Sequence, residues 1–248
     1  MSQLRDKQSG CEWDKEQTFE SIAPYTIEEA YEVADAIDRG NIPDLKEELG
    51  DLLLQVVFLS QIAEEEELFS FEDVAESISQ KLVRRHPYVF SDQKDHTAKE
   101  QVNQWEEIKI KERSKKNQIN ILDGIAKNMP ALKRSQKLQR RASKAGFDWP
   151  DTKGVFEKIR EETLELEEAV QSDDKELMVD EIGDLLMVVT NLAQKMNIDS
   201  EEALKQANKK FTFRFNYIEK ELRKQKKEVS DTNLDELDSL WDESKKLM

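Results

Sequence analysis

The chain has 248 residues, of which 37% are charged, and its formal net charge is −16. The acidic charge excludes general nucleic-acid binding, so we expect no stable nucleic-acid partner. No apolar run approaches roughly 18 residues and no N-terminal apolar segment is present, so neither a membrane span nor a signal peptide is predicted. The single cysteine, Cys11, excludes an intramolecular disulfide and agrees with a reducing, cytoplasmic location. Only 7 Gly and 5 Pro interrupt the chain, which favours long helices over a turn-rich β architecture.

The first predicted unit spans residues 1–122. Its apolar residues recur at helical spacing, first as Ile27, Tyr31, Ala34 and Ile37 and then as Leu45, Leu49, Leu52, Val56 and Leu59. The turn-forming stretch 40–43 separates the two rows, and Asp44 with Glu47 is expected to cap the second helix. The pattern predicts an antiparallel helix hairpin followed by one or two further helices, with a polar loop at about 91–103.

Residues 123–149 read as a connector that ends in Gly-Phe-Asp-Trp. It includes one basic helix, whose cations are Lys133, Lys137, Arg140, Arg141 and Lys144. We expect this basic stripe to dock on the acidic units, and binding of RNA or of a partner protein is the alternative.

The last predicted unit, residues 150–248, repeats the first. Its helical rows are Val155, Ile159, Leu166 and Val170, then Met178, Ile182, Leu185 and Val189. Both units contain Glu-x-Gly-Asp-Leu-Leu, at 48–53 and at 181–186. The chain is therefore a tandem duplication. We predict an all-α fold of two helical units, in which antiparallel hairpins form cores of the four-helix-bundle type. A hydrophobic content of 37% suits thin helical layers or a dimer that shares a core.

Four acids recur in each copy at a constant offset of 133: Glu29, Glu32, Glu48 and Asp51 in the first, and Glu162, Glu165, Glu181 and Asp184 in the second. Each i, i+3 pair shares one helix face. Glu165 lies eight residues before Asp173 and Glu181 eight after it, so the hairpin brings the two pairs level. Because these acids flank the apolar rows, they need a counter-charge, and a hard divalent cation such as Mg²⁺ supplies one.

Two other interpretations of these residues stay open. The acids could be ordinary charges on solvated helix faces, and Glu29 could instead form a capping box with Thr26.

Gly50 and Gly183 lie inside predicted helices, where each costs roughly 1 kcal/mol relative to Ala. That cost indicates a close approach at these positions, either by a partner helix or by a ligand.

Glu-Glu-x-x-Glu followed by Glu-x-x-Asp on the next helix, twice over, resembles the MazG nucleoside triphosphate pyrophosphohydrolases. Trp13-Asp-Lys-Glu-Gln-Thr, Arg84-Arg-His-Pro87 and Gly146-Phe-Asp-Trp149 extend the resemblance over almost the whole chain, although Glu12 stands where the family usually has Pro. The resemblance implies an all-α fold and an obligate homodimer. It also implies Mg²⁺-dependent hydrolysis of NTPs and dNTPs to the monophosphate and pyrophosphate, with the second copy as the active one.

By position, the resemblance makes the four acids of the second copy Mg²⁺ ligands and assigns nucleotide contacts to Lys158, Lys210, Arg214 and Trp241. From the residues alone, Lys210 and Arg214 can bind a triphosphate together or pair with acids, and Trp241 can stack on a base or pack internally. Glu161 or Glu162 is the expected proton acceptor. The first copy keeps its four acids as a second possible metal site, but Tyr25 replaces Lys158 there.

The leading hypothesis for function is hydrolysis of nucleoside triphosphates. One alternative is a related hydrolase restricted to dUTP or to an alarmone. Another is a regulatory or interaction protein whose acids bind metal without turnover. Pyrophosphate release from a panel of NTPs with Mg²⁺ separates the three hypotheses.

Overall fold

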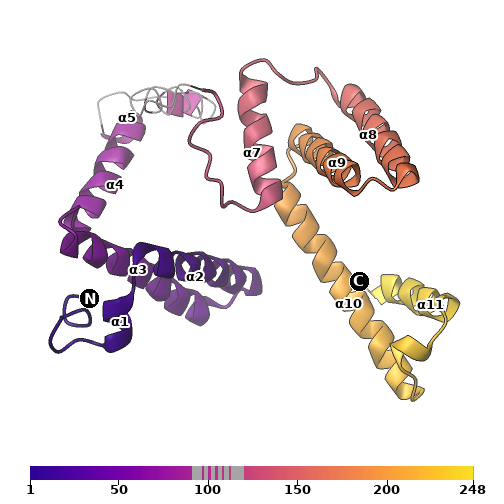
Figure 1. Ribbon diagram of the computed structural model, residues 1–248, viewed down its shortest axis with the longest axis horizontal. Coiled ribbons are helices and arrows are strands. Elements are labelled where there is room, and N and C mark those ends of the chain that lie inside the picture. The colour runs from indigo at the N-terminus through magenta and orange to yellow at the C-terminus, as the bar shows by residue number, and fades with distance from the viewer. Residues whose placement is uncertain are drawn as a thin grey trace. The chain divides into compact units, whose positions relative to one another are not determined.

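The computed structural model describes residues 1–90, 97, 100–101, 104–105, 108, 112 and 120–247. Every regular element among these residues is helical, as the composition predicts. None of the described helices is long and apolar enough to cross a membrane. The loop predicted at about 91–103 lies almost wholly outside the described residues. The chain divides into two compact units, Met1–Ile110 and Lys111–Met248 (Figure 1).

The first unit contains α1 (Glu12–Glu16), α2 (Phe19–Arg39), α3 (Ile42–Glu65), α4 (Phe71–Arg85) and α5 (Pro87–Phe90). Helices α2 and α3 form the predicted antiparallel hairpin. Gly40 ends α2 in the left-handed conformation, with φ 64°, which glycine adopts without steric cost. The predicted cap at Asp44 is wrong: α3 begins earlier, and the side chain of Asn41 accepts the hydrogen bond from the Asp44 backbone amide.

The first hairpin helix also begins earlier than a cap at Thr26 would require. Thr18 is the N-cap residue of α2, and its hydroxyl accepts a hydrogen bond from the backbone amide of Ser21. Thr26 lies inside the helix and donates to the carbonyl of Ile22. The capping-box interpretation of Glu29 is therefore wrong, which leaves this carboxylate available for another role.

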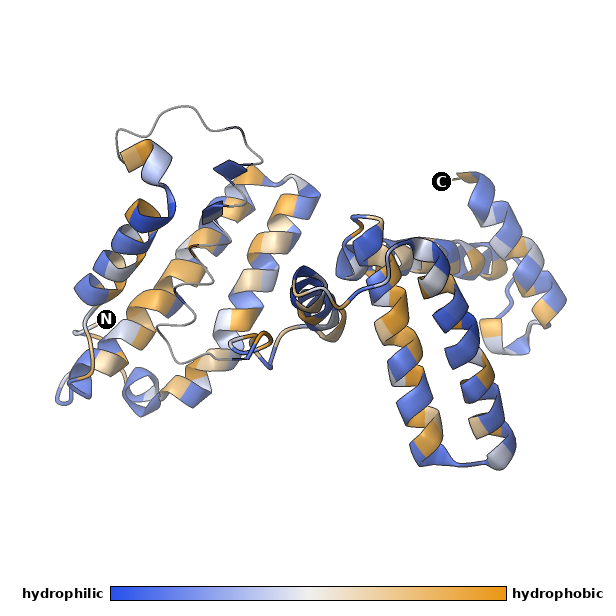
Figure 2. Cartoon of the chain, turned by 90° about the horizontal axis from the view of Figure 1, so that it is seen from above, coloured by the Kyte–Doolittle hydropathy of each residue, from blue (hydrophilic) through white to orange (hydrophobic). Residues whose placement is uncertain are grey.

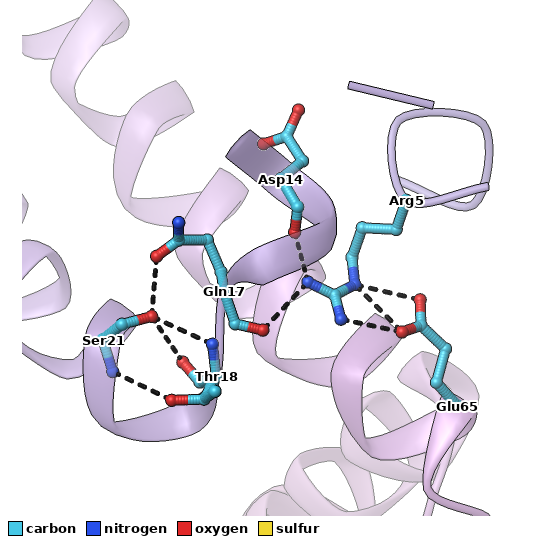
Figure 3. A network of polar contacts seen from close by, with 6 residues as sticks. All are labelled: Arg5, Asp14, Gln17, Thr18, Ser21 and Glu65. Carbon is cyan, nitrogen blue, oxygen red and sulfur yellow. Dashed lines mark hydrogen bonds and ion pairs between the residues drawn. The ribbon is translucent and has the colours of Figure 1, made fainter. Parts of the chain in front are cut away.

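The N-terminal segment of the first unit is tied to α3 through Arg5 (Figure 3). The buried guanidinium donates to both carboxylate oxygens of Glu65, at 2.8 to 3.1 Å, and to the backbone carbonyls of Asp14 and Gln17. It also lies 5.5 Å from the ring centroid of Phe58. These contacts hold α1 against the core of the unit, where Phe58 packs with Ile22 and Ile62.

The second unit contains α7 (Ala131–Lys144), α8 (Thr152–Ser172), α9 (Lys175–Lys195), α10 (Ser200–Lys224) and α11 (Leu234–Ser244), with short 3₁₀ turns at Val229–Asp231 and Lys245–Leu247. Helices α8 and α9 form the second hairpin. Its turn repeats the first at the same offset. Asp173 takes the left-handed conformation of Gly40, with φ 54°, and Asp174 caps α9 as Asn41 caps α3.

Helix α7, part of the predicted connector, packs on α9 within the second unit. Gln139 donates from its amide to the Met187 carbonyl at 2.8 Å and to the Thr190 hydroxyl at 2.7 Å. From the basic stripe, Lys133 forms an ion pair with Asp199 at the start of α10. This contact agrees with the expected docking of the stripe on acidic residues.

Both hairpins leave apolar side chains uncovered. Helix α2 packs mainly on α3 and α8 mainly on α9, so the described helices do not close a four-helix core within either unit. On α9, Ile182, Leu186 and Val189 are each about half exposed. Figure 2 shows hydrophobic residues, in orange, along the hairpin helices of both units. The second unit has a separate small core between α10 and α11, built on Ile218, Leu222 and Leu240.

Candidate metal and nucleotide site

The second hairpin brings its predicted acids together. Glu162, Glu165 and Glu181 each place a carboxylate oxygen within 4.8 Å of the others. Glu162 points inward and is only 3% exposed. Asp184 lies outside this group of three but lines the same cavity as Glu162. The level placement of the two helical pairs, expected from the spacing around Asp173, is confirmed for these three acids.

The cluster carries more negative charge than its surroundings neutralise. Burial raises the pKa of Glu181, and the nearby charges of Glu165 and Glu162 raise it further. Burial also raises the pKa of Glu165, against an opposing effect of Lys158. A divalent cation would relieve the repulsion between these carboxylates, because it stabilises their ionised forms.

Lys158 is a cation in direct contact with this cluster. Its ammonium donates to Glu161 Oε1 at 2.6 Å and lies 2.7 Å from Glu162 Oε1. Hydrogen bonds to these two carboxylates raise the pKa of Lys158, so it stays protonated at neutral pH. Glu161 and Glu162 follow Lys158 by about one turn of α8, so the helix itself fixes their arrangement.

The first hairpin gathers the corresponding acids but surrounds them differently. Oxygens of Glu29, Glu48 and Asp51 lie within 4.8 Å of one another. Burial raises the pKa of Glu29, and the charges of Glu32 and Asp51 add to the effect. Gln55 donates from its side-chain amide to Glu29 Oε1 at 3.3 Å. The side-chain amide of Gln55 is therefore already bonded to one oxygen of Glu29, a possible metal ligand.

Three further predicted nucleotide contacts lie on α10 and α11. The Arg214 guanidinium carbon is 5.3 Å from the Trp241 ring centroid, and the Phe211 ring is 5.4 Å from it. Arg214 Nε is buried without a hydrogen-bond partner, and Lys210 is exposed. Within the described part of one chain, no hydrogen bond or ion pair joins these residues to the acids of the α8–α9 hairpin.

Comparison with known proteins matches both hairpins to one protein family. A model of the MazG nucleotide pyrophosphohydrolase domain matches residues 17–90 and 152–218, which contain the acids of both copies. The chain belongs to the MazG family. A nucleoside triphosphate pyrophosphohydrolase of Escherichia coli K12 is 45% identical to this MazG protein over 250 residues, which cover 99% of this chain and 94% of the relative.

Two further relatives of this MazG protein differ in how much of their own length is matched. The nucleoside triphosphate pyrophosphohydrolase/pyrophosphatase MazG of Thermotoga maritima is 45% identical over 245 residues, covering 99% of this chain and 92% of the relative. The uncharacterized protein YabN of Bacillus subtilis is 41% identical over 238 residues, covering 96% of this chain but 48% of the relative.

The close approach predicted at the mid-helix glycines of this MazG protein is absent within the described chain. A Cβ atom built on Gly50 or on Gly183 meets no atom within 4 Å. The prediction that another helix of this chain packs there is therefore wrong. Both glycines face open space beside an acidic cluster, and the approach of a ligand stays a prediction.

Sequence reasoning missed a cavity of about 810 Å³ in the second MazG unit. Lys158, Glu162 and Asp184 lie at its wall together with Trp149 and Asn191. The helical pattern does not predict a role for Asn191, because it does not distinguish this position from the other positions of α9. The available signal was the duplication itself, since the corresponding residue in the first copy is Phe58.

Proposed function

We propose that this chain hydrolyses nucleoside triphosphates to the monophosphate and pyrophosphate, and that the α8–α9 hairpin holds the Mg²⁺-dependent active site. The observation that carries the proposal is the cluster of Glu162, Glu165 and Glu181 beside a cation, Lys158. Membership of the MazG family and the printed names of the E. coli and Thermotoga relatives support the reaction.

The oxygen ligands of the cluster suit a hard divalent cation. We assign the metal to Glu162, Glu165, Glu181 and Asp184. Mg²⁺ held by these residues would polarise a phosphoryl oxygen and lower the pKa of the attacking water. Glu161 or Glu162 accepts the proton of that water, and Lys158 holds both carboxylates in place by its two short contacts.

Lys210, Arg214 and Trp241 are assigned to nucleotide binding. The unpartnered Nε of Arg214 and the exposed ammonium of Lys210 suit a polyphosphate. We propose that a homodimer supplies these groups from the partner copy, because no hydrogen bond or ion pair among the described residues joins them to the acids of the same chain. The half-exposed apolar residues of α9 are the surface that such a dimer covers. The exposed free thiol of Cys11 suits a cytoplasmic enzyme.

The decisive experiment measures pyrophosphate released from ATP, GTP, CTP, UTP, their deoxy forms and an alarmone, with Mg²⁺ and with EDTA. We expect release from several NTPs that stops when EDTA removes the metal. Release from one nucleotide alone would select the restricted hydrolase instead. Metal binding without any release would contradict the proposal and favour a regulatory protein.

A further inference from the structure

The cavity of the second unit extends away from the acidic cluster toward the end of the connector. Its acidic end holds Lys158, Glu162 and Asp184, and the rest is mostly apolar, with Leu138 and Met187 among its lining residues. At about 810 Å³ it falls within the size range of small-molecule sites. The metal and phosphate groups assigned above therefore fill only one end of it.

Asn191 lines this cavity and has an unmet hydrogen-bonding need. Its side chain is only 5% exposed, and its Oδ1 atom is buried without a partner. Its Nδ2 atom donates to Asp148 Oδ1 at 3.5 Å. Burial opposes ionisation of Asp148, but hydrogen bonds from Lys195 and Ser143 outweigh it and lower the pKa of Asp148. An ionised Asp148 can only accept, so the amide must turn its nitrogen to Asp148 and leave Oδ1 needing a donor.

The aromatic wall of the cavity is held in place from two sides. Lys195 forms an ion pair with Asp148 at 3.0 Å and also donates to the backbone carbonyl of Trp149. The Trp149 ring lies against Gly154 at the start of α8, where an added Cβ atom would come within 2.5 Å of Trp149 Cδ1. The absence of a side chain at Gly154 therefore allows this position of the indole. The neighbouring ring of Phe147 is 84% exposed.

The corresponding region of the first unit is filled by its own side chains. At the offset of 133, Phe58 stands for Asn191, Tyr25 for Lys158 and Ile62 for Lys195. Phe58 is buried, and the Trp13 ring meets both Phe58 and Tyr25 edge-on, with centroids 6.4 and 6.2 Å apart. The buried acceptor, the cation and the anchoring lysine of the second unit are all replaced there by apolar or aromatic groups.

We infer that the cavity binds the nucleobase of the substrate, with Trp149 against the face of the base and Asn191 Oδ1 accepting a hydrogen bond from its edge. This inference rests on the proposed function, because it places the base of an NTP whose phosphates lie at Lys158 and the acids. A base is flat and apolar on its faces, and adenine, cytosine and guanine carry amino donors on their edges. In the first unit, Phe58 and Trp13 exclude a base from the equivalent place.

The test compares NTPs with inorganic tripolyphosphate, which has the phosphates but no base. Asn191→Phe copies the residue of the first unit, and Gly154→Ala displaces Trp149 from outside the cavity. For each variant we expect the KM for NTPs to rise at least 10-fold, while the inhibition constant of tripolyphosphate changes less than 2-fold. Equal weakening of both ligands, or an unchanged KM for NTPs, would overturn the inference.

A second measurement needs no variant. Irradiation of the wild-type protein with Mg²⁺ and 8-azido-ATP should attach the base to peptides that contain 145–154 or 187–191. Attachment to the peptide that contains Trp241, the other aromatic residue assigned to the nucleotide, and to neither of these two peptides would overturn the assignment of the base to this cavity. The proposed function fails separately, through the absence of pyrophosphate release by the wild-type protein from any NTP.

Discussion

The α2–α3 and α8–α9 hairpins share acids, turn geometry and cap positions, yet their surroundings have diverged. The second hairpin places Lys158 against Glu161 and Glu162 and opens on a cavity. The first has Tyr25 at the position of Lys158, and there the aromatic rings of Trp13 and Phe58 pack together. The same carboxylate spacing therefore lies beside an open cavity in one unit and beside packed aromatic rings in the other.

This difference shows that acids at the same spacing can have different surroundings. Gln55 donates to Glu29 in the first unit, whereas the corresponding residue in the second is the apolar Val188, which lines the cavity. An acidic cluster becomes useful for phosphate chemistry when a cation and an accessible cavity accompany it. We conclude that residues around the acids, and not the acids themselves, separate the two units.

The strongest test of this asymmetry is the matched pair Glu181→Gln and Glu48→Gln. Loss of a metal ligand in the second unit should lower kcat/KM for NTP hydrolysis by about 1,000-fold, since metal stabilisation of the transition state contributes several kcal/mol. Glu48→Gln should change it by less than about 3-fold. Steady-state pyrophosphate release measures both variants. Equal losses in the two would show that both units are catalytic and would end the distinction.

The next test replaces the cation Lys158 rather than one of the proposed metal ligands. Lys158→Met should lower kcat/KM about 30-fold, because a charge-assisted hydrogen bond contributes about 2 kcal/mol. The matched variant Tyr25→Phe should leave the rate unchanged, since it keeps the ring that packs against Trp13. The same assay, with circular dichroism to confirm folding, measures both. A rate for Lys158→Met close to that of the wild-type protein would remove Lys158 from the site.

Helical periodicity and the repeat were sufficient to predict the all-α fold, both hairpins and the clustering of Glu162, Glu165 and Glu181. These features depend on contacts close in sequence or symmetric about one turn. The position of α7 on α9 and the cavity beside Asn191 could not be predicted, because they depend on packing between segments more than 40 residues apart. Helix starts were also misjudged where a cap such as Asn41 lay outside the apolar pattern.

A smaller effect is expected from the contacts that Arg5 makes in the first unit. Arg5→Met removes the guanidinium that donates to Glu65 and to the Gln17 carbonyl, whereas the Asp14 carbonyl keeps the Gln17 backbone amide as a donor. The change should lower the free energy of unfolding by about 2 kcal/mol, less than for a fully buried pair because Glu65 is partly exposed. Arg39→Met is the control, since the ion pairs of Arg39 with Asp35 and Asp44 lie at the surface. Urea titration measures both variants.

The activity of Arg5→Met also tests whether a change in the first unit affects NTP hydrolysis. NTP hydrolysis at a temperature where the variant is folded should match that of the wild-type protein, because the proposed active site lies in the other unit. A loss of activity with no change in unfolding would contradict a purely stabilising role for Arg5.

The smallest expected effect is on the pH dependence of stability without metal. The pKa values of Glu29, Glu48, Glu165 and Glu181 are raised above the ordinary value of 4.5, with burial as the first cause and neighbouring carboxylates adding to it. The folded protein therefore binds more protons than the unfolded chain as pH rises above 4.5. Stability from these groups is complete below 4.5 and is lost as pH rises through their raised pKa values.

Thermal melts in EDTA isolate this contribution when the wild-type protein is compared with Glu181→Gln. The wild-type melting temperature should fall relative to that of the variant as pH rises from 4.5 toward 7, because Gln cannot ionise. Mg²⁺ should reverse the fall in the wild-type protein by binding the ionised cluster, and should do so less in the variant. Glu48→Gln extends the comparison to the first unit. If Mg²⁺ does not reverse the fall in melting temperature that depends on Glu48, the acidic cluster of the first unit, beside Gln55 and the packed rings, is not a metal site.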